Sequence, residues 1–371
     1  MSARHLVVRA AAALVLLVPA PLLAQGPTWL TGVEARGISY QSQTGFFIKS
    51  VSEVSIPVAV IWPVNSRLAF DVGGRWATAT RKGTDTTATI SGLTDIQARG
   101  VYQIVPDLLA LTVSANLPTG KTNFTGGQLL TAGAIASDLL PYPVANFGSG
   151  FNVTSGLAVA VPVGGWAVGV AGSYRVNGSF TSAAGSYRAG GEFRVRAGAD
   201  RIIGQSRVSF GFTYSGFGED NLASSPIFQS GNRYIGQGSW SFPVGNVGLQ
   251  VYAWDLYRAP GSQLFGSPVP MQKSNVLSFG TAASVQLGAN VLRPQVEFRM
   301  HWLGDSTLAT AGRLLAFALQ YEMTLNARFS LLPSVRFDTG NENLIDGNGN
   351  PTAPTASFTG WNVGLMLRAR T

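Results

Sequence analysis

The stretch Arg293-Pro-Gln-Val-Glu-Phe-Arg-Met-His-Trp302 alternates between polar and apolar side chains with a period of two. Its odd-numbered positions up to His301 are polar or charged, and its even-numbered positions from Val296 onwards are apolar. Successive side chains of a β-strand point to opposite faces, so this stretch predicts a strand with one polar and one apolar face.

The same alternation recurs along the chain, for example over Glu192–Asp200 and Leu315–Leu325. The predicted strands run to about ten residues or more, which is typical of strands that cross a membrane. In a soluble sandwich the apolar faces would form one core. The pattern recurs too often for a single core to bury all of these faces.

The composition supports an apolar outer surface. Only 12% of the 371 residues are charged and 46% are hydrophobic, whereas soluble domains have about 25% charged residues. After residue 24, no run of about 20 apolar residues predicts a transmembrane helix. A closed barrel satisfies both observations, because it pairs all its backbone polar groups while presenting apolar side chains to lipid.

The predicted connections alternate between short and long. Short turns are expected near 63–66, 106–107, 162–165, 204–206, 243–246, 288–290 and 326–328. Longer polar segments are expected near 41–47, 82–89, 119–147, 179–187, 217–232, 259–274, 304–312 and 339–357. These connections predict an all-β, antiparallel transmembrane barrel of about sixteen strands, with fourteen as the alternative, short periplasmic turns and longer extracellular loops.

The first 24 residues resemble an export signal. Arg4 and Arg9 precede the apolar run 10–17, and Leu22-Leu23-Ala24 fits a cleavage site. We therefore predict a signal peptide over residues 1–24, one barrel domain over residues 25–371, and a location in the bacterial outer membrane. Without the signal, 24 basic residues face 18 acidic ones, a net charge of +6. The chain has no Cys, so the fold needs no disulfides.

Aromatic residues gather near the ends of the predicted strands, which predicts two girdles at the membrane interfaces. They are Trp29, Trp62, Trp76, Trp166, Tyr174, Tyr234, Trp240, Trp302 and Trp361.

Charged residues on the polar faces are candidates for the lining of an aqueous lumen. They are Arg67, Asp71, Arg75, Asp95, Arg99, Arg175, Glu192, Arg194, Arg196, Arg207, Arg233, Arg293, Glu297, Arg299, Glu322 and Arg336. Arginines outnumber acids in this set, which favours anions in a pore. The alternative is that these charges pair along the wall and only stiffen it.

The longest predicted loop, 119–145, contains a stretch from Gln128 to Leu140 that permits a short helix before Pro141. This loop could fold into the lumen as a constriction. Alternatively, its helix could lie over the mouth of the barrel or pack on neighbouring loops.

Three segments resemble the "MetA-pathway of phenol degradation" family of outer-membrane barrels. They are Ser91-Gly-Leu-Thr-Asp95, the run from Leu111 to Lys121 that contains Leu117-Pro-Thr-Gly120, and Asn146-Phe-Gly-Ser-Gly150. The resemblance covers residues 90–180 or so and implies a barrel that passes small, often aromatic or apolar, compounds. Unlike the distantly related fatty-acid channels, the chain has too few residues before its first strand for a lumen-filling hatch.

The predicted function is an outer-membrane channel for passive diffusion or uptake of small solutes, with a mildly anion-favouring lumen. A structural or adhesive barrel with a blocked lumen is the alternative. We expect no enzyme activity, because His301 is the only histidine after the signal and no nucleophile motif accompanies it. The Asp346–Asn350 run opens like a calcium loop but lacks the later acid. We expect no metal or other cofactor. Expected partners are membrane lipid and small solutes, not nucleic acid, and homo-oligomer formation stays open.

Overall fold

The computed structural model describes residues 26–41, 45, 47–182, 184–265, 269–305, 307–345 and 350–370. The predicted signal peptide and the 346–349 part of the calcium-like run lie outside these ranges. None of the described helices is long and apolar enough to cross a membrane.

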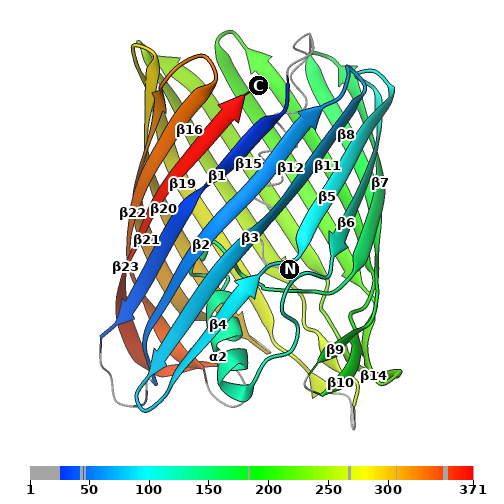
Figure 1. Cartoon of the computed structure of the whole chain (residues 1–371), viewed down its shortest axis with the longest axis vertical. Helices are drawn as coiled ribbons and strands as arrows, with labels where there is room; N and C mark the ends of the chain where they lie inside the picture. The colour runs from blue at the N-terminus through cyan, green and yellow to red at the C-terminus, as the bar shows by residue number, and fades with distance from the viewer. Residues whose placement is uncertain are drawn as a thin grey trace.

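The described chain forms a closed antiparallel barrel of sixteen strands (Figure 1). β1 pairs with β2 on one side and with the last strand, β23, on the other, which closes the wall. One of the sixteen is interrupted and consists of β4 and β5. In chain order the strands are β1 (Thr28–Tyr40), β2 (Ile48–Pro63), β3 (Leu68–Gly83), β4 (Thr87–Leu93) with β5 (Ile96–Val105), β6 (Leu109–Leu117), β7 (Asn152–Val163), β8 (Trp166–Asn177), β11 (Glu192–Ile203), β12 (Ser206–Phe217), β15 (Arg233–Val244), β16 (Val247–Arg258), β19 (Lys273–Leu287), β20 (Asn290–Gly304), β21 (Ala309–Thr324), β22 (Phe329–Ile345) and β23 (Pro351–Arg370).

All seven predicted short turns are present, at one end of the barrel. Three of the predicted long loops are wrong in extent, because most of 82–89, 304–312 and 339–357 belongs to β3, β4, β20, β21, β22 and β23. Three other loops form a second, six-stranded sheet at the loop end, which the sequence did not predict. Its strands are β9 (Phe180–Ser182), β10 (Gly185–Arg188), β13 (Glu219–Leu222), β14 (Ser225–Gln229), β17 (Ser262–Gln263) and β18 (Val269–Pro270).

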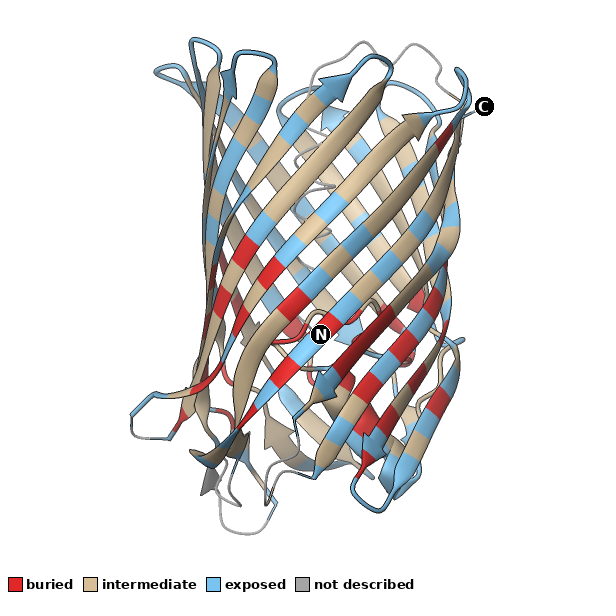
Figure 2. Ribbon diagram, turned by 90° about the vertical axis from the view of Figure 1, so that its left-hand side faces the viewer, coloured by how far each residue is buried: buried red, intermediate tan, exposed pale blue. Residues whose placement is uncertain are grey.

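The outer face of the wall is apolar over most of its height. On β2, Val54, Ile56, Val58 and Trp62 are among the exposed large apolar side chains, and the intervening side chains point inward. Figure 2 shows this alternation as exposed and less exposed residues in turn along several strands. The prediction from the period of two is confirmed.

The alternation reverses its polarity near the loop end of β23. Trp361 and Val363 are exposed, but two residues nearer the loop the exposed side chains are Thr359 and Ser357, while Phe358 is buried on the inner face. The same inner face supplies other buried apolar side chains at this end, which form the main core of the protein with residues from the loop between β6 and β7. The wall residues are Ile38, Val51, Ala77, Ala79, Ile90, Leu314, Ala316 and Phe358. Figure 2 shows the buried residues gathered towards this end.

Candidate functional site

The chain between β6 and β7 folds back inside the barrel, and we call residues 120–149 the inserted segment. It contains the one helix among the described residues, α2 (Gly126–Ile135). The helix begins after Thr125, whose backbone N–H donates to the side chain of Gln128 (3.2 Å), a pairing typical of helix starts. Side chains of Gln128 and Thr131 donate to backbone oxygens of β4, at 3.0 and 3.2 Å.

Beyond the helix, the inserted segment contacts β2. The backbone N–H of Val144 donates to the carboxylate of Glu53 (2.7 Å), and the Tyr142 hydroxyl donates to the backbone oxygen of Val51 (3.4 Å). The Arg36 guanidinium lies 5.3 Å from the centre of the Tyr142 ring, within the range of a cation–π contact. These contacts fix one side of the segment to the β1–β2 wall.

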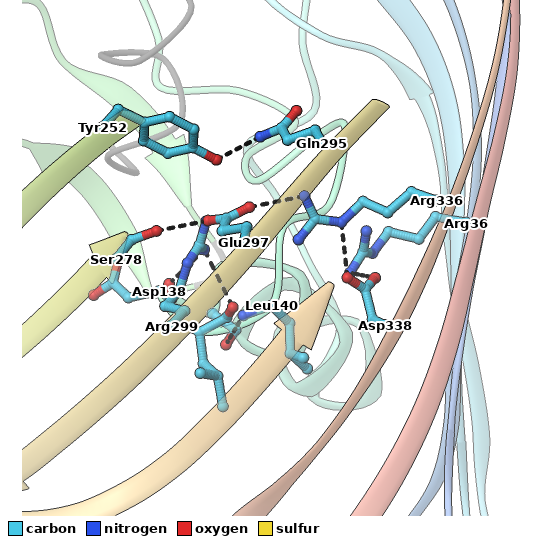
Figure 3. Close-up of polar contacts among 12 residues, drawn as sticks. Arg36, Asp138, Leu140, Tyr252, Ser278, Gln295, Glu297, Arg299, Arg336 and Asp338 are labelled. Atoms are coloured by element: carbon cyan, nitrogen blue, oxygen red, sulfur yellow. Dashed lines mark hydrogen bonds and ion pairs between the residues drawn. The ribbon is translucent and has the colours of Figure 1, made fainter. Parts of the chain in front are cut away.

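The same segment also contacts a different part of the wall. The Asp138 carboxylate pairs with Arg258 on β16 (2.9 Å), and Arg299 on β20 donates to the backbone oxygens of Asp138 (3.1 Å) and Leu139 (3.2 Å). By the strand pairings, six strands separate β16 from β2 on the shorter way around the barrel. A segment that reaches both must cross the lumen, and Figure 3 shows its Asp138 and Leu140 beside Arg299 of the wall. The predicted entry of the loop into the lumen is therefore observed.

A chain of alternating charges links this anchor to the closing strands (Figure 3). Arg36 and Arg336 both bind Asp338, each at 2.7 Å, and Arg336 and Arg299 both bind Glu297, at 2.9 and 2.6 Å. Asp338 is fully buried and Arg36 is 1% exposed. Buried charges are tolerated only when they are paired and hydrogen-bonded. The network therefore holds β1, β20, β22 and the inserted segment in one arrangement.

The ion pair of Asp138 makes the anchor sensitive to acid. Burial raises the pKa of Asp138, but the positive charge of Arg258 and its neighbours outweighs burial, so the pKa lies below its usual value. A carboxyl group with a lowered folded pKa stabilises the fold above its unfolded pKa of about 3.9. That contribution is lost as the pH falls through the lowered value.

We therefore expect acid to loosen the inserted segment. In single-channel recordings between neutral pH and about pH 3, the wild-type current should become noisier below about pH 4. Asp138→Asn should already be noisy at neutral pH and should change less on acidification, since it has no carboxylate to protonate at that position. Identical pH profiles for the two proteins would show that Asp138 does not anchor the segment.

The register places most of the predicted site residues on the inner face of the wall. These are Asp71, Arg75, Arg99, Arg175, Glu192, Arg194, Arg196, Arg207, Arg233, Arg293, Glu297, Arg299, Glu322 and Arg336. Several form ion pairs along the wall: Arg99 with Asp71 (2.6 Å), Arg293 with Glu322 (2.8 Å), Arg194 with Glu192, and Arg207 with Asp200. Their contact with solutes stays a proposal.

Two predicted site residues have other surroundings. Arg67 lies in the exposed turn between β2 and β3, where its backbone N–H donates to Asn65 (2.8 Å). Asp95 lies in the break between β4 and β5, is 7% exposed, and accepts hydrogen bonds from the backbone of the inserted segment. The period of two placed Asp95 on the correct face but could not reveal the chain that covers it.

Sequence reasoning missed several residues of the site: Arg36, Glu53, Asp138, Tyr142, Arg258 and Asp338. Arg36 lies in β1, whose alternation is weak, and Asp338 lies next to a stretch predicted as a loop. Glu53 lies on the inner face of β2 with Val51 and Ser55, and alternation alone could not indicate that the inserted segment binds it. The signal that could have found Asp338 is its spacing of two from Arg336.

Towards the turn end, the inner wall borders a cavity of about 760 Å³. Its lining includes Arg207, Arg293 and Arg336 together with uncharged polar residues such as Gln250 and Gln295. Apolar residues such as Phe242 and Leu319 line it as well, so the cavity is mixed in polarity.

No protein-family profile and no curated protein matches the chain. Solved structures similar to it include an anion-selective porin from Comamonas acidovorans (12% identity, TM-score 0.41, covering 94% of this chain and 99% of the porin). Others are OmpF of Salmonella typhi in complex with daunomycin (12%, 0.44, 92% and 98%) and the CymD monoaromatic hydrocarbon channel (10%, 0.41, 93% and 89%). These similarities are too low to assign a family or a function, so the resemblance to the phenol-degradation family stays a prediction.

Proposed function

We propose that the protein is a channel of the bacterial outer membrane through which small polar solutes diffuse, with a preference for anions. The observation that carries the proposal is the inserted segment, which crosses the lumen and is held at both walls by Glu53, Arg258 and Arg299. A segment fixed in this way narrows the lumen without requiring a separate plug domain.

The outer face supports the membrane location. On β2, exposed apolar side chains run from Val54 to Trp62, a rise of about 26 Å along the strand at about 3.3 Å per residue. At the usual tilt of about 35–45°, this corresponds to about 20 Å along the barrel axis, most of the apolar band of about 25 Å found in outer-membrane barrels. Exposed Trp29 and Trp62 lie near the turn end of this band and Trp76 and Trp361 near its other end, in agreement with two girdles.

The preference for anions follows from how charge is distributed on the inner face. β8, β11, β12, β15 and β16 carry six inward arginines there, whereas their inward acids are Glu192 and Asp200, and Asp138 of the inserted segment adds a third. The arginines are Arg175, Arg194, Arg196, Arg207, Arg233 and Arg258. On β1, β2 and β3 the inward charges balance: Glu34, Glu53 and Asp71 against Arg36, Arg75 and Arg81. The positive excess thus lies on one side of the lumen, where it attracts anions.

Single-channel conductance in a planar bilayer tests the proposal, with selectivity read from the reversal potential in a salt gradient. Steady steps with an anion preference are the expected result. Absence of conductance in well-folded protein would reject the channel and favour a structural or adhesive barrel with a blocked lumen. The inward arginines of β8, β11, β12, β15 and β16 favour polar solutes over the aromatic or apolar compounds that the family resemblance implies. Lack of enzyme activity and the oligomeric state stay predictions.

The charge argument predicts a change in selectivity. The double variant Arg196→Gln, Arg233→Gln should lower the anion-to-cation permeability ratio roughly twofold or more. It removes two positive charges from the side of the lumen that carries the positive excess. Arg201→Gln is the matched control, since Arg201 lies on the outer face of β11, over the ring of Trp166. Equal reversal potentials for wild type and the double variant would contradict the assignment.

A further inference from the structure

The three segments that carry the family resemblance are separate in the sequence, and they meet around Asp95. One Asp95 carboxylate oxygen accepts from the backbone N–H of Gly120 (2.9 Å). The other accepts from the backbone N–H of Ser149 (2.6 Å) and from its hydroxyl (3.1 Å). Gly120 and Ser149 are the two ends of the inserted segment. One buried side chain therefore binds both the entry and the exit of the segment that crosses the lumen.

The backbone around Asp95 strengthens this attachment. The Asp95 N–H donates to the backbone oxygen of Phe147 (3.1 Å). Next to it, the Thr119 hydroxyl donates to the backbone oxygen of Thr94 (2.9 Å) and accepts from the N–H of Ile96 (2.9 Å). These bonds occupy the break between β4 and β5. The wall strand is interrupted at the point where it takes both ends of the segment, and such irregularities commonly mark functional positions.

Close approach of the two ends explains two glycines of the motifs. A Cβ on Gly120 would lie 2.0 Å from the Phe147 oxygen and 2.7 Å from the Asp95 nitrogen. A Cβ on Gly148 would lie 2.8 Å from the Lys121 oxygen. Both contacts are too short for any side chain, so glycine is required for the two ends to lie against each other and against Asp95.

We propose that Asp95 is the positioning residue of the constriction: its carboxylate hydrogen-bonds to both ends of the inserted segment and so fixes the aperture of the pore. The inference rests on the proposed channel function. Hydrogen bonds from neutral N–H groups to a carboxylate are among the stronger ones in proteins. With these bonds weakened, the segment would still be covalently attached to β6 and β7 but would move at its base. The aperture would then fluctuate while the barrel stays closed.

The test uses Asp95→Asn, which keeps one acceptor oxygen but replaces the other by an NH2 group facing an N–H donor. We expect a several-fold increase in open-channel current noise and faster proteolytic cleavage within residues 121–147. Asp220→Asn is the matched control, because the Asp220 carboxylate also accepts from a backbone N–H, that of Gly190 (2.7 Å), but within the second, six-stranded sheet. It should behave like wild type in both measurements.

A disulfide rescue separates positioning from a general loss of structure. A Cβ on Gly127 of α2 would lie 3.1 Å from the Cβ of Ala88 on β4, slightly below the range of about 3.5–4.5 Å found in disulfides. The chain has no cysteine of its own, so Ala88→Cys with Gly127→Cys can pair only with each other. In the Asp95→Asn background, forming this disulfide should lower the open-channel current noise to the wild-type level and slow proteolytic cleavage. Reduction of the disulfide should reverse both effects.

The outcomes decide the proposal. Wild-type noise and cleavage rates in Asp95→Asn would overturn the proposed role of Asp95, while the proposed channel function would stand. If wild type does not conduct, the channel function fails, and the cleavage rates alone still decide whether Asp95 holds the segment. If Asp95→Asn does not fold, Ser149→Ala is the second variant, because it removes only the hydroxyl contact. It should raise current noise and cleavage rate by less than Asp95→Asn would. No change in either would overturn the proposed role of Asp95.

Discussion

Asp338→Ala is expected to destabilise the barrel by about 3–5 kcal/mol, the usual cost of leaving a buried charge without its partner. Asp338 is fully buried and binds Arg36 and Arg336, and Arg36 is itself 1% exposed. Removing the carboxylate leaves two guanidinium groups next to each other with little access to water. Urea unfolding of the refolded protein in lipid vesicles, followed by tryptophan fluorescence, measures the loss.

The control for this variant is Asp71→Ala. Asp71 also pairs with an arginine on the inner face, but its side chain is 34% exposed and that of Arg99 is 23% exposed. Partly exposed ion pairs contribute about 0–1 kcal/mol. The two variants should therefore differ by several-fold in their loss of unfolding free energy. Equal losses would mean that the Asp338 network is hydrated in the membrane and that burial does not set its importance.

Removing most of the inserted segment is expected to raise single-channel conductance several-fold, because the part of the chain that crosses the lumen is gone. The ends of the excised part are already adjacent, since Gly148 packs against the backbone of Lys121. Residues 122–145 can therefore be replaced by a short glycine-containing turn without stretching the wall. Planar-bilayer recordings of the shortened and full-length proteins measure the change.

Excision also uncovers apolar wall residues such as Ile38 and Phe358, so the shortened barrel should unfold at lower urea concentrations. Shortening the hairpin of β13 and β14 is the control, because this hairpin belongs to the second, six-stranded sheet at the loop end and pairs there with β10 and β17. It should leave conductance near the wild-type value. Unchanged conductance after excision of residues 122–145 would show that the segment does not limit the current.

The barrel could be predicted because its strands obey one simple rule. From Arg293 to Trp302 the inner and outer faces differ in polarity at every position but Pro294, and the structure places Glu297 and Arg299 inside and Val296 outside. Six of the seven turns contain Gly or Asn, as at Gly288, and the seventh is marked by Pro106 and Asp107.

The extent of the strands at the loop end could not be predicted from the same rule. There the outer side chains are Ser357 and Thr359 and the inner ones are Ala356 and Phe358. A search for apolar outer faces reads such a stretch as a polar loop, although its backbone remains paired. The reversal occurs where the inner face meets the inserted segment and the outer face bears serine and threonine.

The charged site was predicted only in part, because alternation gives the face of a residue but not its partner. Arg336 and Glu297 were expected to line the lumen, yet their pairing across two strands at 2.9 Å depends on the register. For Asp138, the sequence pattern gave neither a face nor a partner. It lies in an irregular segment, where no periodicity indicates that it meets Arg258, 120 residues away in the sequence.

The buried core at the loop end straddles the seam where the first and last strands meet. Ile38 of β1 and Phe358 of β23 pack in one cluster with Leu139 and Tyr142, which come from the middle of the chain. Neither the seam nor the inserted segment buries its apolar side chains without the other. We therefore expect closure of the wall and docking of the segment to occur as one coupled step in folding. This step joins the most distant parts of the sequence, so it should come late in folding and be slow.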